Sequence, residues 1–425
     1  MDREVKFRFL TYFLFVLACT FFYAASPGDD LSSSYIGCLL ISQGNIENLY
    51  DHHAQLFHVV DSRAWDALAA QVGFSGFLHP YVQIPLWAWL LQPLCSTLSF
   101  NAFSILFLAL NLLSLVIILE LCLRCWTPGF KSFNWLIPLL GAIFVFVPFV
   151  YAMWLIQTHL IFLAITMVGM LAAEHGRARS AGVLLAVAAA VKLTPVFLLI
   201  YWMVKKRFLA IAWFLVSIGV VSLITLALPG IRVCQEFIDT LYRVSNTLLV
   251  SFNNQSLSAW WAYDVSFRGE LRNWRSFELS SLMKMVSLIF LLLMVILASI
   301  FSRYAENELQ QGAAICLALA SITTFSPIAW THYYLVLLPA IMVLVQTKQV
   351  FFIISAGVVF LLNIEPLSVD PVVPMFTNIA IVRSHFFSAL ITMLSLTIFL
   401  GLNISKKLSR LRMGGNPHGL DRGRL

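Results

Sequence analysis

The segment from Phe208 to Leu228 contains no charged side chain. A helix needs about 20 apolar residues to cross the hydrocarbon core of a bilayer. Similar runs recur along the chain, in which 60% of the residues are hydrophobic and only 11% are charged. In soluble proteins about a quarter of the residues are charged. The sequence therefore predicts an all-α polytopic membrane protein whose surface mostly contacts lipid.

The N-terminal apolar stretch, residues 9–25, follows three basic residues, Arg3, Lys6 and Arg8. It is longer than the roughly 7–15 residues of a signal-peptide core, so we expect a retained first helix. Basic residues collect on the cytoplasmic side of membrane proteins, which places the N-terminus inside. The net charge of +7 then reflects topology, and no nucleic-acid partner is expected.

All the later basic clusters can also lie on the cytoplasmic side if two conditions are met. Residues 79–98, which are short and interrupted by proline, must lie at the interface rather than cross. Residues 181–204, flanked by basic clusters, must form a hairpin of two half-helices with Lys192 and Pro195 at its outer tip. The clusters are Arg124/Lys131, Arg177/Arg179, Lys205/Lys206/Arg207, Arg303, Lys348 and Lys406/Lys407/Arg410/Arg412.

This topology predicts one membrane domain, residues 1–404, of about twelve spanning or half-spanning helices with both chain ends inside. A basic cytoplasmic tail, 405–425, follows. The outer segments are a large first loop, 26–100, a second, 229–281, and a third, 364–385. The remaining spans are expected near 102–123, 134–151, 156–173, 208–228, 282–301, 312–325, 333–346, 350–363 and 386–404.

Polar residues that played no part in setting the topology gather at the outer face. Ionisable groups at membrane depth are costly and usually mark a site. A lysine there can hold a phosphate, and an aspartate can deprotonate a hydroxyl nucleophile. The sequence thus predicts an outer site for an anionic, lipid-linked substrate. The residues concerned are Asp29, Asp30, Gln157, His159, Lys192, Asn254, Gln255, Ser256 and His332.

Six short motifs in this order resemble those of the GT-C glycosyltransferases, specifically glycosyltransferase family 87. They are spread over most of the chain, and His79-Pro80-Tyr81 has one proline where the family often has two. The motifs are Asp30…Gly44…Leu49-Tyr50-Asp51, His79-Pro80-Tyr81, Gln157 in IQTHL, Gly182…Lys192-Leu193-Thr194-Pro195, Asn254-Gln255-Ser256, and Ser326-Pro327…Trp330-Thr331-His332-Tyr333.

The resemblance implies a GT-C-like bundle that moves a hexose, by analogy mannose, from a polyprenyl-phosphate donor to a hydroxyl of a lipid or glycan acceptor. The expected reaction is a single inverting displacement at the outer face of a bacterial plasma membrane, without a cofactor or metal. His52, His53 and His58 lack a second ligand set, which argues against a metal site there. Membrane lipids are the other expected partners.

The resemblance also suggests individual roles. Asp30 is the expected general base, with Asp29 as the alternative, and His332 would donate to the leaving phosphate or assist the base. Lys192 and Arg268 would hold the donor phosphate. The expected substrate-binding residues are Asp29, His79, Gln157, His159, Asn254, Gln255, Ser256, Trp330 and Tyr333.

Each assignment has a structural alternative. Lys192 can snorkel to the interface, and Trp330 and Tyr333 can be interfacial aromatics. Asn254-Gln255-Ser256 can form a turn, and Cys122-x-x-Cys125 can be packing residues. At the level of the whole protein, a secondary transporter or lipid-linked-sugar flippase is the main alternative. A non-catalytic scaffold for cell-envelope assembly and a mannosyltransferase of another GT-C architecture are further ones.

Overall fold

The computed structural model describes residues 3–51, 60–130, 133–265, 274–364 and 383–413, which are mostly helical. The helices up to the hairpin are α1 (Arg3–Tyr23), α2 (Asp29–Ser42), α3 (Arg63–Gln71), α4 (Pro85–Cys95), α5 (Phe100–Leu121), α6 (Phe133–Phe144), α7 (Val147–Trp154), α8 (His159–Glu174), α9 (Ala178–Val191) and α10 (Leu198–Val204). The later elements are α11 (Phe208–Ala227), α12 (Ile231–Asn246), β1 (Thr247–Val250), α13 (Leu257–Val265), β2 (Arg275–Glu278), α14 (Ser281–Tyr304), α15 (Glu308–Phe325), α16 (Leu337–Gln346), α17 (Val350–Leu361) and α19 (Ser384–Met413). Short non-α turns are η1 (Ile46–Asn48), η2 (Cys122–Trp126), η3 (Pro128–Phe130), η4 (Thr194–Phe197) and η5 (Thr331–Val336).

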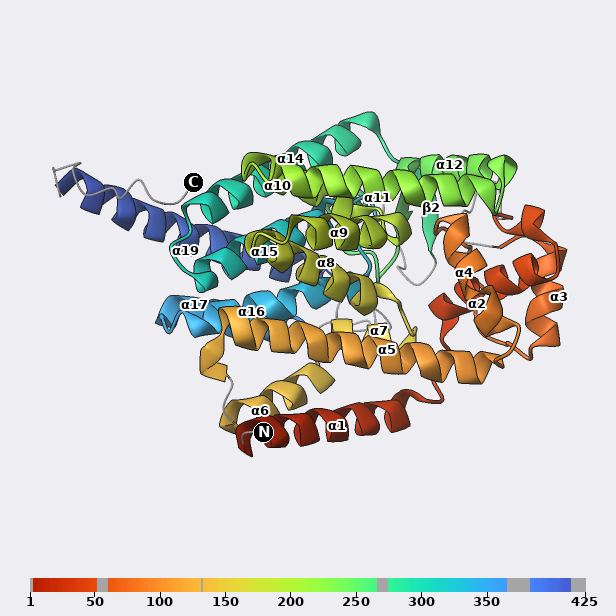
Figure 1. Ribbon diagram of the computed structural model, residues 1–425, viewed down its shortest axis with the longest axis horizontal. Coiled ribbons are helices and arrows are strands. Elements are labelled where there is room, and N and C mark those ends of the chain that lie inside the picture. The colour runs from red at the N-terminus through yellow and green to blue at the C-terminus, as the bar shows by residue number, and fades with distance from the viewer. Residues whose placement is uncertain (1–2, 52–59, 131–132, 266–273, 365–382, 414–425) are drawn as a thin grey trace.

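The long helices run side by side along the longest axis of the molecule (Figure 1). The start of α1 and the far end of α19 lie at one end of this bundle, which we call the terminal end. Helices α2, α3, α4 and α12 lie at the opposite end, which we call the loop end. An ion pair of 3.2 Å between Arg8 and Glu120 joins the start of α1 to the close of α5 at the terminal end.

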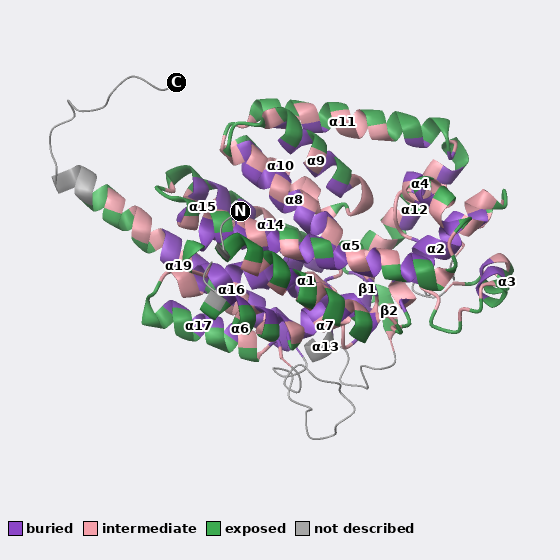
Figure 2. Cartoon of the chain, turned by 60° about the horizontal axis from the view of Figure 1, so that its bottom comes forward, coloured by how far each residue is buried: buried purple, intermediate pink, exposed green. Residues whose placement is uncertain are grey.

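Among the described residues, five helices are long and apolar enough to cross a membrane, and a sixth span results if α7 and α8 count as one bent span. The five lie within α1, α5 with its η2 extension, α11, α14 and α19. Figure 2 shows α11 largely exposed and α8 and α16 largely buried, as expected if α11 contacts lipid. The chain is therefore a multi-pass membrane protein, but the expected twelve segments are not confirmed.

The expected hairpin at 181–204 is present as two helices with a break between them. Helix α9 ends when Lys192 adopts an extended conformation, and the η4 turn that contains Pro195 leads into α10. Helix α9 packs closely on α11 because Gly182 has no side chain: a Cβ there would lie 2.5 Å from the carbonyl oxygen of Ala210. The break therefore places Lys192 at the end of a firmly packed helix.

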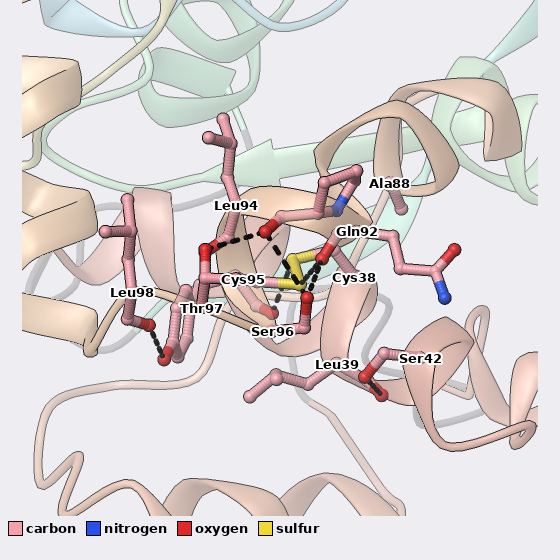
Figure 3. The surroundings of a disulfide bond; sticks show 12 residues. Cys38, Leu39, Ser42, Ala88, Gln92, Leu94, Cys95, Ser96, Thr97 and Leu98 are labelled. Atoms are coloured by element: carbon pink, nitrogen blue, oxygen red, sulfur yellow. Dashed lines mark hydrogen bonds between the residues drawn. A yellow bond between two sulfur atoms is a disulfide. The ribbon is translucent and has the colours of Figure 1, made fainter.

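A disulfide between Cys38 of α2 and Cys95 of α4 ties together the helices of the first loop (Figure 3). Helix α4 is not among the candidate spans, in agreement with an interfacial position for residues 79–98. The pairing was not predicted, although both cysteines fall in the segment expected outside. Disulfides form and persist in oxidising compartments, so this pair is relevant to the question of which side of the membrane the loop end faces.

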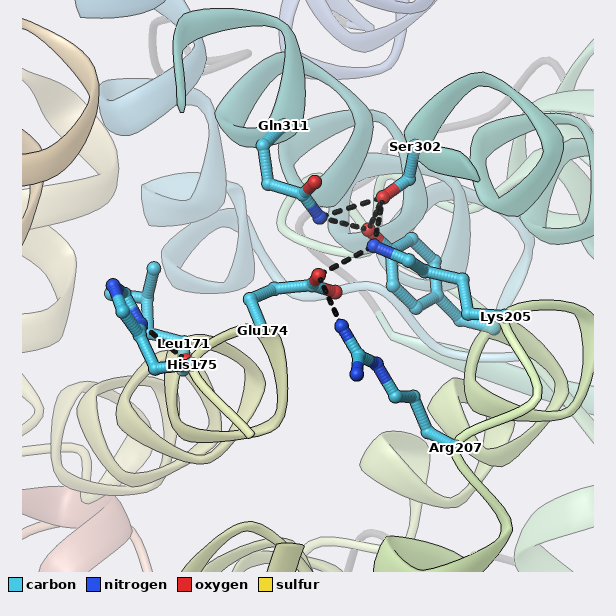
Figure 4. Close-up of polar contacts among 8 residues, drawn as sticks. Leu171, Glu174, His175, Lys205, Arg207, Ser302 and Gln311 are labelled. Carbon is cyan, nitrogen blue, oxygen red and sulfur yellow. Dashed lines mark hydrogen bonds and ion pairs between the residues drawn. The ribbon is translucent and has the colours of Figure 1, made fainter. Parts of the chain in front are cut away.

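A buried polar network joins four helices near the terminal end (Figure 4). The Lys205 ammonium donates to Glu174 Oε2 at 2.5 Å and to Ser302 Oγ at 2.8 Å. The Tyr201 hydroxyl donates to the same serine oxygen at 2.5 Å, and the Gln311 amide donates to it at 2.6 Å. The network thereby connects side chains from α8, from α10 and the turn after it, from α14 and from α15.

The second outer segment contains α12, α13 and a two-stranded antiparallel ribbon rather than loop alone. In the ribbon Val250 pairs with Arg275 and Thr247 pairs with Glu278. Most of the third outer segment, residues 365–382, lies outside the described residues. Helix α19 continues past residue 404 to Met413, so the beginning of the expected tail is helical.

Candidate active site

The carboxylate of Asp30 is held between two segments that are distant in sequence. Its Oδ1 lies 3.2 Å from His79 Nε2, and its Oδ2 accepts a hydrogen bond from the Gln157 amide. Asp29 and Asp30 occupy the first turn of α2, where the helix dipole favours negative charge. The Asp30 side chain is only 16% exposed. A nearly buried carboxylate with two fixed partners has the orientation that a general base requires.

The backbone reaches this geometry through a sharp bend between α7 and α8. The two helices meet at 119°, and Ile156 at the bend has a φ of +49°. A β-branched residue rarely adopts the left-handed region, so the surrounding contacts must hold it there. Gly28, itself at φ +63°, donates its backbone N–H to Trp154 and leaves room for Ile156. The bend thereby brings Gln157 to Asp30.

Asp29 lies beside this carboxylate but is more enclosed. Its Oδ1 is buried and has no hydrogen-bond partner within the ranges that the structure describes. Gly76 makes this enclosure possible, because a Cβ at that position would lie 2.2 Å from the oxygen. Burial raises the pKa of Asp29, and the neighbouring Asp30 charge adds to the effect, while His79 and the Phe77 backbone N–H oppose it. Among the described residues, Asp29 therefore lacks the side-chain partners that orient the carboxylate of Asp30.

A cation and two imidazoles surround the Tyr333 ring, close to Asp30. The Lys192 ammonium lies 4.1 Å from the centre of the Tyr333 ring and is close enough to Asp30 for the two charges to interact. Among the described residues, no carboxylate lies within ion-pair distance of Lys192. The Tyr333 ring stacks on His159 at 4.7 Å and meets His332 edge-on at 4.7 Å. The cluster therefore offers one positive charge without a fixed counter-ion.

His332, expected to donate to the leaving phosphate or to assist the base, is buried. It lies in η5, is 2% exposed, and its Nε2 has no partner in the described part of the chain. A buried imidazole nitrogen without a partner costs stability. Such a group beside Lys192 is a candidate for hydrogen bonding to a substrate.

Asn254, Gln255 and Ser256 serve the fold directly. They are almost fully buried, at 0%, 2% and 0% exposure. The Asn254 side chain accepts from the Ala329 backbone N–H at 2.9 Å, and the Ser256 hydroxyl donates to the Pro327 carbonyl at 3.0 Å. These bonds clamp the loop that carries Trp330. Any contribution of the three residues to the site acts through that loop.

Two residues of this region were missed. Arg383 is fully buried and donates to the backbone carbonyls of Ser251 and Asn254, which fixes the same loop from the start of α19. No sequence pattern distinguishes it from other arginines. Trp274 precedes β2, and its ring lies 5.5 Å from that of Trp330. Arg268, expected at the donor phosphate, lies outside the described residues, as do His52, His53 and His58.

An apolar cleft with a cavity volume of about 40 Å³ leads away from Lys192 between α8, α10, α15 and η5. His159 and Lys192 stand at its polar side, and most of the other lining residues are aliphatic or aromatic. The apolar part of the lining is Phe162, Leu163, Pro195, Leu198, Leu319, Ile322 and Val336. The cleft could accept a hydrocarbon chain attached to a group held at Lys192.

The sequence profile of glycosyltransferase family 87 matches residues 81–327, more than half of the chain. No curated protein and no solved structure gives a significant match. The matched region includes Gln157 and Lys192, and the hydrogen bond from Gln157 connects it directly to Asp30. The chain belongs to glycosyltransferase family 87 and is a membrane glycosyltransferase.

Proposed function

We propose that this glycosyltransferase transfers a hexose, with mannose as the first candidate, from a polyprenyl phosphate to an acceptor hydroxyl, with inversion. The observation that carries the proposal is that Asp30, fixed by His79 and Gln157, lies near Lys192, which forms no ion pair within the described residues. A base and a phosphate-binding cation are the two groups that such a displacement needs.

In the proposed step the Asp30 carboxylate takes the proton of the acceptor hydroxyl while its oxygen attacks C1 of the sugar. The bond between C1 and the phosphate oxygen breaks, and its electrons remain on the lipid phosphate. Lys192 stabilises this charge, and the unpartnered Nε2 of His332 is available to donate to it. A single displacement inverts the anomeric centre. The cleft beside Lys192 is suited to the first isoprene units of the donor.

We propose that the loop end faces the extracytoplasmic side. The Cys38–Cys95 disulfide lies in the same loop as Asp30 and requires an oxidising compartment. The basic N-terminal residues and the basic end of α19 lie at the opposite, terminal end (Figure 1). The position of the basic residues agrees with the positive-inside rule, and the disulfide supports the same orientation.

The test is sugar transfer by the purified protein in lipid nanodiscs, with radiolabelled polyprenyl-phosphate mannose and a membrane lipid extract as acceptor source. Asp30→Asn should lower transfer by about 10²–10⁴-fold, the usual contribution of a general base. The matched control is Asp66→Asn, which changes an exposed carboxylate on α3 of the same loop.

His332→Ala should also lower transfer, whereas His175→Ala, at an exposed position after α8, should not. Near-normal transfer by folded Asp30→Asn would reject the assignment of the base. Label that crosses a vesicle membrane while still attached to its donor would favour the flippase alternative. Failure with mannose but transfer from another polyprenyl-linked sugar would correct only the donor.

A further inference from the structure

An aromatic wall adjoins the Asp30–His79 pair and shares no residue with the lining of the apolar cleft. It consists of Phe77, His79, Trp274 and Trp330. The Trp274 ring stacks on His79 at 6.0 Å with an interplanar angle of 30°, and lies 5.5 Å from Trp330 at 31°. The Phe77 ring is 4.9 Å from His79 and 6.3 Å from Trp274.

The wall is partly exposed and lies outside the candidate membrane spans. Phe77 is 48% exposed, and Trp274 and Trp330 are partly exposed. None of the four residues belongs to a helix that could cross a membrane. Their segments are fixed from behind: β2 pairs with β1 directly after Trp274, and Asn254 bridges to Trp330. The rings therefore form a preorganised surface.

The chemistry of the wall differs from that of the cleft. The cleft beside Lys192 is lined mainly by aliphatic side chains and suits a flexible hydrocarbon chain. The wall presents flat π-faces, which carry negative potential and attract the positively polarised C–H groups of a pyranose ring. Its member His79 contacts the base, so a ring held there has its hydroxyls near Asp30.

We propose that this aromatic wall is the acceptor subsite and that the acceptor is a glycan, bound by stacking of a pyranose ring on Trp274. This inference rests on the proposed function, because it takes Asp30 as the base that the acceptor hydroxyl must reach. Stacking on Trp274 favours a glycan over a simple lipid alcohol as the acceptor. The donor lipid and the acceptor sugar thus approach the catalytic residues over different surfaces.

The test compares Trp274→Ala with Trp261→Ala, a matched change of an exposed tryptophan on α13 outside the wall. Binding of a mannose disaccharide to the donor-free protein is measured by saturation-transfer NMR, with glycerol as a hydroxyl compound lacking a ring. Trp274→Ala should weaken disaccharide binding and raise the acceptor KM by about tenfold, as expected for loss of one aromatic contact. The donor KM should stay unchanged, because Trp274 is not part of the lining of the cleft beside Lys192.

Phe77→Ala, on a different segment, should act in the same direction, and Trp274→Tyr should retain most binding. These variants keep the test valid if Trp274→Ala does not fold. An effect on the donor KM instead of the acceptor KM would overturn the inference, as would disaccharide binding equal to that of Trp261→Ala. If Asp30→Asn abolishes transfer while the wall variants behave normally, only the acceptor subsite is wrong. An active Asp30→Asn enzyme would reject the proposed function itself.

Discussion

Lys192 and Lys205 follow the two halves of one broken helical hairpin, yet their surroundings are opposite. Lys205 is paired with Glu174 and Ser302 inside a network that includes Tyr201. Lys192 lies over an aromatic ring and has no counter-ion in the described structure. A buried cluster that pairs its charges stabilises a fold, whereas a buried charge without an ion pair is typical of a binding or catalytic site. The contrast separates the structural lysine from the functional one.

The largest effect on stability is expected at the Lys205 network. Lys205→Met leaves Glu174 buried without its main partner, because their side chains are only 8% and 10% exposed. Removing one partner of a buried pair costs about 3–5 kcal/mol, so the unfolding temperature in detergent should fall clearly. Transfer per folded molecule should stay close to normal.

The double variant Lys205→Met/Glu174→Gln serves as the control, because it removes both charges and should recover part of the loss. If Lys205→Met abolished transfer without lowering the unfolding temperature, the two lysines would not differ as proposed.

Lys192→Met should show the reverse pattern. Without the ammonium, the charge developing on the leaving phosphate is not compensated, and transfer should fall by about 10²–10³-fold, as for loss of one preorganised donor. The unfolding temperature should be unchanged, since no ion pair is broken. Lys192→Arg should keep part of the activity because it retains the charge. A Lys192→Met protein that is unstable but fully active when folded would contradict this assignment.

The smallest effect is expected at Asp29. Its pKa is raised by burial, so the ionised form is disfavoured in the folded state and stability is lost as the pH rises through that pKa. Asp29→Asn should therefore raise the unfolding temperature at pH 8 by about 1–3 °C, a change of less than 1 kcal/mol. The gain should be smaller at pH 4 than at pH 8, because acid favours the protonated form of the native carboxyl. An equal gain at both pH values would show that charge is not its cause.

Much of this arrangement could be predicted from the sequence, because charge distribution and helix breaks are local signals. The basic clusters place Asp30 and Lys192 at the same end, and the proline after Lys192 marks the hairpin break. The structure brings Asp30, His79 and Gln157, which come from three separate motifs, into contact.

Other features depend on contacts that no local pattern records. The Cys38–Cys95 bond requires α2 to pack on α4. The pairing of Trp274 with Trp330 depends on a strand ribbon and a distant bridge. The motifs predicted that Asn254 binds substrate. In the structure its side-chain oxygen accepts a hydrogen bond from the backbone N–H of Ala329, far along the chain.

The close approach of α9 to α11 at Gly182 also controls where the hairpin ends. Ten residues of helix separate Gly182 from Lys192, about 15 Å at the rise of an α-helix. A methyl group at position 182 would meet the α11 backbone and push α9 away or along its neighbour. Because α9 is rigid, this displacement would also move its C-terminal end and change the depth of the Lys192 ammonium group. Gly182 and Lys192 are therefore mechanically coupled. The packing of α9 on α11 at Gly182 determines how deep the Lys192 ammonium group lies.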